Sequence, residues 1–415
     1  MMFALVDCNN FYASCEHLFQ PKLEKKPLAI LSNNDGIVIA RSPKAKALGV
    51  KMGQPAFELK DDIEKGKLKV LSSNFSLYAD MSQRVMQTLS TYSPDMEIYS
   101  IDEAFFLLEK ESNLRAKGIE MRKKVKKWTG IPISIGIAPT KTLAKLANEA
   151  AKKGETGVLV LSDSAEIEER LGATDLEEIW GIGSRLSQKL RRKGIYTAKQ
   201  LRDCEDNWIR KLLGVTGYRT VLELRGVPCF ELMEEPEKKK KSIVCSRSFS
   251  QKIDTLSVIE AAVASFATRA AKKLRDQKSL AGFLSVFVAT SPFSEPYVSH
   301  SCHVQIPNPT SFTPELITLA KEGLSKIYQP GLGYKKAGIL LADFIDEEAA
   351  PLDFLTPRPT SLKKAKAMKI VDAINARAGK EAIRFASQGV GKKWQGARSH
   401  VSPKFTTSWS ELLKI

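Results

Sequence analysis

The chain has 415 residues, 43% of them hydrophobic and 27% charged, and 64 Lys and Arg residues against 47 Asp and Glu residues give it a net charge of +17. This length predicts roughly two to four globular domains, and we expect neither a membrane span nor a signal peptide, because no long apolar run and no basic, apolar leader occurs. The basic balance favours a nucleic-acid partner, although a merely cationic soluble protein would share it, and six cysteines without a CxxC pair argue against a zinc site and favour a reducing cytoplasm.

Residues 1–161 alternate between predicted strands and helices, as in an α/β fold. An Asn-Asn-Asp-Gly run at 33–36 predicts a hairpin turn. Ser42 and Pro43 are expected to begin a short helix that ends at Gly49. We expect strands at 3–6, 27–31, 37–40, 97–108, 131–137 and 158–161, and further helices at 10–19, 76–92, 113–128 and 139–153.

The second half of the chain has three predicted parts. Short helices and Gly-rich turns extend to about residue 226, and a charged run without apolar residues at 234–242 predicts a linker. Residues 243–346 have a β-α-β-β-α-β order, which is a recurring small α/β fold. Beyond 347 the chain is Pro-rich, then contains a basic helix at about 361–378, and ends in a Gly-rich, sparsely apolar stretch.

Three carboxylates lie at the ends of predicted core strands. Asp7 follows the first strand, and Asp102 and Glu103 lie in the run Ser-Ile-Asp-Glu-Ala at 100–104. Burying ionised carboxylates costs several kcal/mol unless a cation compensates, and three of them suit two Mg²⁺ ions about 4 Å apart. On a flat strand Asp102 and Glu103 would face opposite sides, so both reach Asp7 only if the chain turns there. A structural, salt-bridged pair at a strand end is the alternative.

Two basic helices supply the cations that a phosphate substrate needs. The first is the short helix at 42–49, which Arg41 precedes. In the second, Lys141, Lys145 and Lys152 lie within about 40° of one another on one face. The alternative is an ordinary amphipathic helix whose lysine face is solvated.

The run Ile-Trp-Gly-Ile-Gly at 179–183, followed by a basic helix, has helix-hairpin-helix character. Gly181 and Gly183 let backbone N–H groups approach a phosphate, and the helix N-terminus adds partial positive charge. Arg185 and Lys189 reinforce such a site, which contacts the nucleic-acid backbone and not the bases. A simple turn between two helices is the alternative, and residues 213–218 form a second, weaker candidate.

Several runs together resemble the Y-family DNA polymerases over about 1–346. They are Asp-Cys-Asn-Asn-Phe-Tyr-Ala-Ser-Cys-Glu at 7–16, Ser-Ile-Asp-Glu-Ala-Phe at 100–105, Gly-Ile-Ala-Pro-Thr-Lys-Thr-Leu-Ala-Lys-Leu-Ala at 136–147 and Trp-Gly-Ile-Gly at 180–183. The runs at 31–41, 46–53, 73–82 and 245–249, and the basic tail, resemble the UmuC-like subgroup, the catalytic subunits of bacterial DNA polymerase V and its plasmid-borne relatives.

The resemblance implies a multidomain α+β/α/β right-hand polymerase with a mixed-sheet palm, small fingers, a helical thumb containing the helix-hairpin-helix, and a βαββαβ little finger. The domain boundaries it implies are 1–20 and 75–168 for the palm, 21–74 for the fingers, 169–233 for the thumb, 234–242 for the linker, 243–346 for the little finger and 347–415 for a basic C-terminal tail.

The resemblance also implies residue roles. Asp7, Asp102 and Glu103 would be the catalytic ligands of two Mg²⁺ ions, or of Mn²⁺, with the backbone carbonyl of Cys8. Tyr12 would be a steric gate against ribonucleotides, with Phe11 beside it. Pro43 stands where many relatives have a triphosphate-binding tyrosine. The triphosphate contacts would be Arg41, Lys46 and Lys152, and the DNA contacts Gly181, Gly183, Arg185, Lys189 and Arg247.

The function implied is error-prone translesion synthesis: template-directed addition of a dNTP to a primer 3′-hydroxyl, in DNA damage tolerance and SOS mutagenesis, in the cytoplasm and on DNA. The partners implied are primer-template DNA, a UmuD′-like accessory dimer, RecA, and a sliding clamp bound through Leu352, Phe354 and Leu355, where the usual glutamine is missing. A non-catalytic DNA-binding scaffold of the same fold is the alternative. A palm-type nucleotidyl cyclase would share the metal chemistry but would need neither the hairpin nor the tail.

Overall fold

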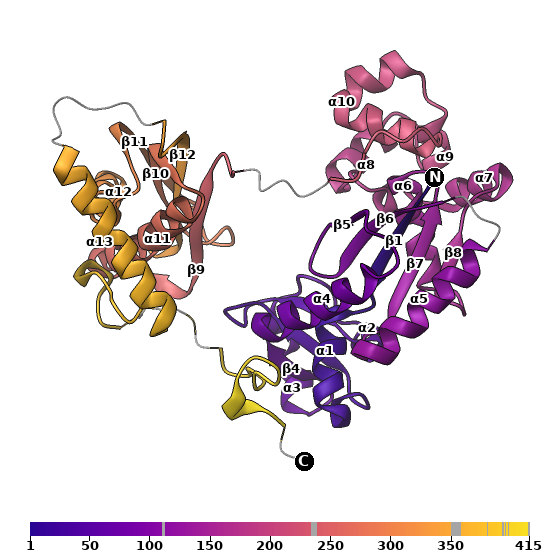
Figure 1. Cartoon of the computed structure of the whole chain (residues 1–415), viewed down its shortest axis with the longest axis horizontal. Coiled ribbons are helices and arrows are strands. Elements are labelled where there is room, and N and C mark those ends of the chain that lie inside the picture. The colour runs from indigo at the N-terminus through magenta and orange to yellow at the C-terminus, as the bar shows by residue number, and fades with distance from the viewer. Residues whose placement is uncertain are drawn as a thin grey trace. The chain divides into compact units, whose positions relative to one another are not determined.

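The computed structural model describes residues 1–109, 113–233, 239–349, 358–379, 381–391, 394, 396 and 398–413 (Figure 1). The chain forms two compact units. The first contains Met1–Ser32, Ile37–Pro236 and His400–Ile415, and the second contains Asn33–Gly36 and Glu237–Ser399. No helix in the described part of the chain is both long and apolar enough to span a bilayer.

A five-stranded sheet with the order β5-β6-β1-β7-β8 lies at the centre of the first unit. The strand β1 (Met2–Cys8) lies in its middle, antiparallel to β6 (Glu103–Leu108) and β7 (Ile133–Ala138). The outer strands are β5 (Met96–Ile98) and β8 (Val158–Val160). The three central strands β6, β1 and β7 are buried almost throughout. Their predicted apolar runs therefore reflect a sheet that is covered on both faces.

Successive residues of β1 point to opposite faces of this sheet and enter two different cores. Ala4 and Val6 pack with α1 (Phe11–Phe19), α4 (Phe75–Leu89) and α5 (Leu114–Thr129). Phe3 and Leu5 pack on the other face with α6 (Lys141–Ala151) and the helices that follow it. The alternation therefore places α1 and α6 on opposite faces of the sheet.

A smaller sheet has the order β3-β2-β4. The strands β2 (Leu28–Leu31) and β3 (Val38–Arg41) form the predicted hairpin, and β4 (Lys69–Ser72) adds to β2 in parallel. The short helix α2 (Pro43–Ala47) begins as predicted, since the Ser42 hydroxyl accepts a hydrogen bond from the Ala45 N–H at 3.2 Å. Neither β4 nor α3 (Lys60–Glu64) was predicted, because such short elements show no clear hydrophobic period.

Four helices follow the central sheet and share a core with α6: α7 (Ser164–Ala173), α8 (Ser184–Arg191), α9 (Ala198–Arg202) and α10 (Asp206–Leu224). Gly214 breaks α10 with a left-handed φ of 71°. A break between two helices therefore occurs at the weaker of the two predicted hairpins.

The second unit has the predicted β-α-β-β-α-β order. Its sheet is arranged β11-β10-β12-β9, and α11 and α12 pack against it. The elements are β9 (Ile243–Ile253), α11 (Leu256–Asp276), β10 (Ser279–Ala289), β11 (Ser299–Thr310), α12 (Thr313–Ile327) and β12 (Tyr334–Asp346).

The C-terminal stretch is not one tail. The predicted basic helix is present as α13 (Arg358–Arg377). Trp394 is 2% exposed and packs on Phe266 in the core of the second unit, whereas residues 400–413 belong to the first unit. The sequence was interpreted as sparsely apolar here, and its few apolar side chains serve as anchors. The clamp candidates Leu352, Phe354 and Leu355 lie outside the described residues, as do 234–238 of the linker.

Candidate active site

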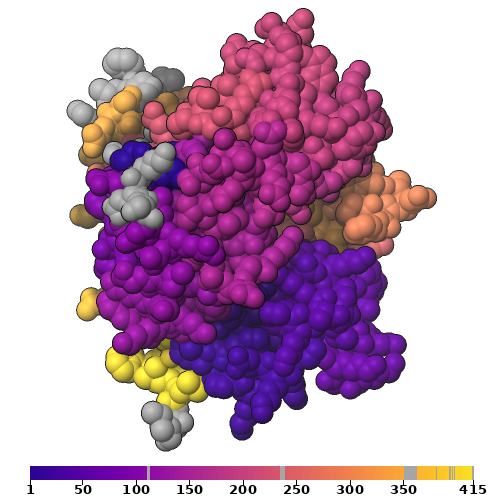
Figure 2. Space-filling view, turned by 90° about the vertical axis from the view of Figure 1, so that its right-hand side faces the viewer, coloured from indigo at the N-terminus to yellow at the C-terminus, as the bar shows by residue number. Residues whose placement is uncertain are grey.

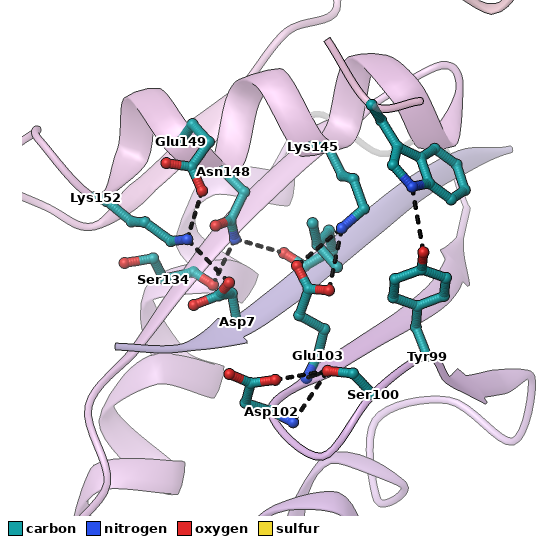
Figure 3. Close-up of polar contacts among 12 residues, drawn as sticks. Asp7, Tyr99, Ser100, Asp102, Glu103, Ser134, Lys145, Asn148, Glu149 and Lys152 are labelled. Carbon is teal, nitrogen blue, oxygen red and sulfur yellow. Dashed lines mark hydrogen bonds and ion pairs between the residues drawn. The ribbon is translucent and has the colours of Figure 1, made fainter. Parts of the chain in front are cut away.

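The strand register brings Asp7 and Glu103 together. Asp7 is the Cα partner of Glu103 on β6 and of Ser134 on β7. Side chains directly opposite each other on antiparallel strands lie on the same face with Cβ atoms about 5 Å apart. The two carboxylates therefore share the face of the sheet that α6 covers (Figure 3).

A tight turn between β5 and β6 brings Asp102 to the end of β1. The N–H groups of Tyr99 and Ser100 donate to the Glu103 carbonyl at 3.0 and 3.1 Å. The Cys8 N–H donates to the Asp102 carbonyl at 2.9 Å, which ties the turn to the end of β1. The Asp102 carboxylate accepts from the Ser100 hydroxyl at 2.6 Å and points toward the turn (Figure 3).

Two lysines of the α6 segment face the carboxylates. Lys152 Nζ lies 2.9 Å from Asp7 Oδ2 and 2.5 Å from Glu149 Oε1. Lys145 Nζ donates to both oxygens of Glu103, at 2.9 and 3.1 Å (Figure 3). The lysine face of this helix is therefore turned toward acidic side chains and not toward solvent. Sequence reasoning missed the Lys145–Glu103 pair, although the common face of the lysines was a signal for it.

The electrostatics of Asp7 reflect this crowding. Burial raises the pKa of Asp7 to about 6; Lys152 opposes that rise, and the nearby Glu103 and Asp102 charges add to it. Burial lowers the pKa of Lys152, but Asp7 and Glu149 outweigh that effect and raise it. Burial and two neighbouring carboxylates make Asp7 hard to ionise. A bound divalent cation would stabilise its ionised form.

The carboxylates are suitable ligands for such a cation, but each of them contacts another side chain in this structure. No group of three His, Cys, Asp or Glu side chains among the described residues is arranged to hold a metal ion. Lys152, Lys145 and Ser100 instead hold the three carboxylates. Three carboxylates and a backbone carbonyl are nevertheless the oxygen ligands that Mg²⁺ or Mn²⁺ prefers, so cation binding requires the lysines to release Asp7 and Glu103.

Tyr12 lies in the first turn of α1, on the face of the central sheet opposite α6. Its ring stacks on Tyr78 with centroids 4.3 Å apart and planes 14° apart, and its edge meets Phe75 at 5.9 Å. Burial, with a contribution from Asp102, raises the pKa of Tyr12. The neighbouring Phe11 is buried in the core. Sequence reasoning assigned no role to Phe75 or Tyr78, which begin α4.

The other expected triphosphate contacts lie on the three-stranded sheet and its helix. Arg41 ends β3, and its guanidinium donates to the Val50 carbonyl, while its Nε is buried without a partner. Lys46 is exposed on α2. Of the three expected triphosphate contacts, Lys152 forms an ion pair with the carboxylates. Among the described residues, Arg41 and Lys46 do not.

The predicted helix-hairpin-helix is a sharp turn into α8. Gly181 has a φ of 87°, which favours glycine, and Gly183 precedes the first residue of α8. Arg185 is exposed, whereas Lys189 donates to the Leu212 carbonyl at 2.7 Å, just before the break at Gly214. This contact fixes the two hairpin turns to each other.

Arg247 lies on β9 of the second unit and is exposed. Partial burial, together with the nearby charges of Arg269 and Arg398, lowers its pKa. Arg269 is paired with Glu381, and a polyanion near the exposed Arg247 would offset the charges that oppose its protonation.

Lys141, the third lysine of the face, is part of a buried ion pair with Glu97. Their side chains are 3% and 6% exposed. Lys141 also donates to the Glu231 carbonyl at 2.8 Å, and Glu97 accepts from the Met233 N–H at 2.8 Å. This lysine is therefore not available to a phosphate; it holds the segment after α10 against the central sheet.

We expect Lys141→Met to lower the free energy of unfolding by about 3–5 kcal/mol, because Glu97 would remain buried without its cation. Urea unfolding followed by circular dichroism measures this change. Lys153→Met, which alters an exposed lysine on the same segment, is the control. The double variant with Glu97→Gln should recover part of the loss, and an unchanged midpoint in the single variant would contradict the assigned role.

Comparisons with known proteins identify the family and the fold of the chain. Residues 6–149 match the impB/mucB/samB family, 240–354 match that family's C-terminal domain, and 365–415 match a domain of unknown function. The chain is similar to Protein UmuC of Salmonella typhimurium, with 44% identity over 100% of both chains, and to Protein ImpB of Salmonella typhimurium, with 43% identity over 99% of both. It is 32% identical to DNA polymerase IV 1 of Bacillus subtilis over 54% of each chain. Among solved structures, a Y-family DNA polymerase chimera of Dbh and Dpo4 has the same fold, with a TM-score of 0.65 and 21% identity over 83% of this chain and 100% of the chimera.

Proposed function

The chain belongs to the impB/mucB/samB family of Y-family translesion DNA polymerases, and from that membership we propose that it adds dNTPs to a primer 3′-hydroxyl by two-Mg²⁺ catalysis in error-prone SOS synthesis. The observation that carries the proposal is the register of Asp7 opposite Glu103, with Asp102 on the adjoining turn. These carboxylates and the Cys8 carbonyl would hold the cations.

Bound divalent cations would lower the pKa of the attacking hydroxyl and neutralise charge on the triphosphate. The chain's own contribution is to place the ligands on rigid strands and to supply cations for the phosphates. Lys152 would be released from Asp7 when that carboxylate turns to another partner, and its ammonium, still paired with Glu149, could then bind a phosphate oxygen. Arg41 and Lys46 are further candidates for the triphosphate.

Selection of deoxynucleotides is assigned to Tyr12. Its ring is held by Tyr78 and Phe75 and is close enough to Asp102 for that charge to affect its hydroxyl. A sugar placed near the carboxylates would pack on this ring, and a 2′-hydroxyl would collide with it. Phe11 supports α1 from the core side.

Primer-template DNA is the proposed macromolecular substrate. The turns at Gly181 and Gly183, the exposed Arg185 and the arginine surface around Arg247 suit contacts to its backbone. Similarity to Protein UmuC over the whole chain supports a UmuD′-like dimer and RecA as partners, with action on DNA in the cytoplasm. A sliding clamp is the proposed partner of Leu352, Phe354 and Leu355.

Primer extension by the purified chain with Mg²⁺ and four dNTPs, on damaged and undamaged templates, tests the proposal. The experiment is done with and without a UmuD′-like dimer and RecA. Because Lys152 and Lys145 already neutralise Asp7 and Glu103, a non-catalytic DNA-binding scaffold is the second candidate. Binding of primer-template without any extension, even with the accessory proteins, would favour the scaffold.

We expect Lys152→Met to change both the chemistry of Asp7 and nucleotide binding. Without the lysine, the pKa of Asp7 should rise above about 6, because burial and the neighbouring carboxylates would act unopposed. The KM for dNTP should rise by about tenfold, since a charge-assisted contact to phosphate is lost. Carbon-13 NMR of the Asp7 carboxyl in metal-free protein, assigned with Asp7→Asn, measures the first effect.

Steady-state kinetics measure the second effect. The matched control is Lys153→Met, because the exposed Lys153 directly follows Lys152. A normal KM in Lys152→Met together with a raised pKa of Asp7 would limit Lys152 to pairing with the carboxylate.

A further inference from the structure

The last described residues of the chain, His400–Leu413, form a segment that we call the C-terminal strap. The strap belongs to the first unit, although the residues just before it belong to the second (Figures 1 and 2, yellow). It extends the three-stranded sheet, since the Ser72 N–H donates to the His400 carbonyl at 2.9 Å and the His400 N–H donates to the Ser72 hydroxyl at 3.1 Å. Ser72 also forms a parallel bridge with Val401.

Two contacts anchor the strap to the helices behind Tyr12. Phe405 is 6% exposed and stacks on Phe19 of α1, with centroids 5.1 Å apart and planes 8° apart. The Asn74 amide donates to the Ser402 hydroxyl and carbonyl at 2.9 and 3.2 Å and to the Pro403 carbonyl at 3.0 Å. Asn74 also caps α4, because its side-chain oxygen accepts from the Leu77 N–H.

The strap then reaches the support of Tyr12 through one buried carboxylate. The Ser402 hydroxyl donates to Glu16 Oε1 at 2.9 Å, and the Tyr78 hydroxyl donates to the same oxygen at 2.7 Å. Glu16 and Tyr78 are both 0% exposed. Tyr78 in turn carries the Tyr12 ring on its face at 4.3 Å. Ser402, Glu16, Tyr78 and Tyr12 are thus linked by three successive contacts.

Glu16 has no cationic partner among the described residues, so its buried carboxylate relies on hydrogen bonds, one of which comes from Tyr78. The position of Tyr78 is therefore coupled to this carboxylate. Its charge is held by hydrogen bonds from Tyr78, Ser402 and Gln20, and burial raises its pKa. When one of few donors to a buried carboxylate is removed, the remaining donors must move or water must enter. Either change displaces Tyr78, and the ring stacked on it follows.

We propose that the strap is a positioning element for the sugar gate, with Ser402 acting through Glu16 and Tyr78 to set the position of the Tyr12 ring. The proposal rests on the function proposed above, in which Tyr12 excludes the 2′-hydroxyl. The proposal assigns a function to the last residues of the matched domain of unknown function, which covers 365–415. Ser402 is a positioning residue, since it is buried and acts on Tyr12 only through Glu16 and Tyr78.

The test compares kcat/KM for a ribonucleotide with kcat/KM for the matching deoxynucleotide in primer extension. This ratio does not depend on the fraction of folded enzyme, so a purely structural loss would leave it unchanged. In Ser402→Ala the ratio should rise between about threefold and about tenfold, because small displacements of a positioned group change rates by such factors. In Ser402→Thr, which keeps the hydroxyl, the ratio should return toward that of the native chain.

Two further variants complete the experiment. Phe405→Ala detaches the strap without touching Glu16 and should raise the ratio in the same direction, which keeps the test available if Ser402→Ala folds poorly. Trp409→Ala alters a strap residue that is 92% exposed and should leave the ratio unchanged.

The possible failures are distinguishable. A native chain that binds primer-template but never extends it would overturn the proposed polymerase function, and this inference with it. Normal extension with an unchanged sugar ratio in both Ser402→Ala and Phe405→Ala would overturn this inference alone.

Discussion

Asp102→Asn is expected to lower kcat for primer extension by at least about a thousandfold, because the proposed cations would lose an anionic ligand that no neighbouring group would replace. The substitution is nearly isosteric, and an amide oxygen still accepts the hydrogen bond that Ser100 donates to this side chain. Asp102 lies on a turn and is half-buried, so the fold does not depend on its charge. We therefore expect the unfolding midpoint to stay within error of that of the native chain.

Single-turnover extension with increasing Mg²⁺ measures this loss and separates weak cation binding from a slow chemical step. Asp95→Asn is the matched control, since it neutralises an exposed carboxylate a few residues upstream in the same unit. If Asp102→Asn extended primers at the native rate, the assignment of the three carboxylates to cations would be wrong. They would then be a structural cluster that Lys145 and Lys152 neutralise.

Tyr12→Ala is expected to raise ribonucleotide incorporation relative to deoxynucleotide incorporation by about a hundredfold, because the ring that would meet the 2′-hydroxyl is gone. Addition of dNTPs should change far less, since the carboxylates and lysines stay in place. Tyr12→Phe keeps the ring and its stack on Tyr78 and removes only the hydroxyl. It should retain most of the sugar selectivity.

The measurement is kcat/KM for matched ribonucleotide and deoxynucleotide pairs on one template. Unchanged selectivity in Tyr12→Ala would exclude Tyr12 as the gate. A loss of selectivity in Tyr12→Phe as large as that in Tyr12→Ala would assign the discrimination to the hydroxyl and its proximity to Asp102, and not to the bulk of the ring.

Much of the fold followed from local patterns. The βαββαβ order of the second unit was predictable because its strands and helices are long enough to show their own hydrophobic periods. The Ser42 cap and the hairpin at 33–36 followed from residues with strong local preferences. The strand β4 escaped prediction, since four residues are too few to show a usable hydrophobic period.

The candidate site was predictable in composition but not in its contacts. Asp7, Asp102 and Glu103 stood out because acidic side chains follow apolar strands, and a turn at Asp102 was required for them to meet. The pairing of Lys145 with Glu103 and of Lys152 with Asp7 was not predicted. Such pairs depend on how α6 lies over the central sheet, which is decided by packing between segments far apart in the sequence.

The sequence by itself thus determined most of the elements, the acidic and basic residues of the site, and the family to which the chain belongs, because these depend on residue types and on short-range spacing. Only the tertiary structure decided which residues touch. It separated Lys141, which is buried against Glu97, from Lys152 on the same helical face. It also brought Ser402 to Glu16, nearly the whole length of the chain away. Such contacts form when burial of Phe405 against Phe19 outweighs the entropy of closing a long loop, and no local pattern records that balance.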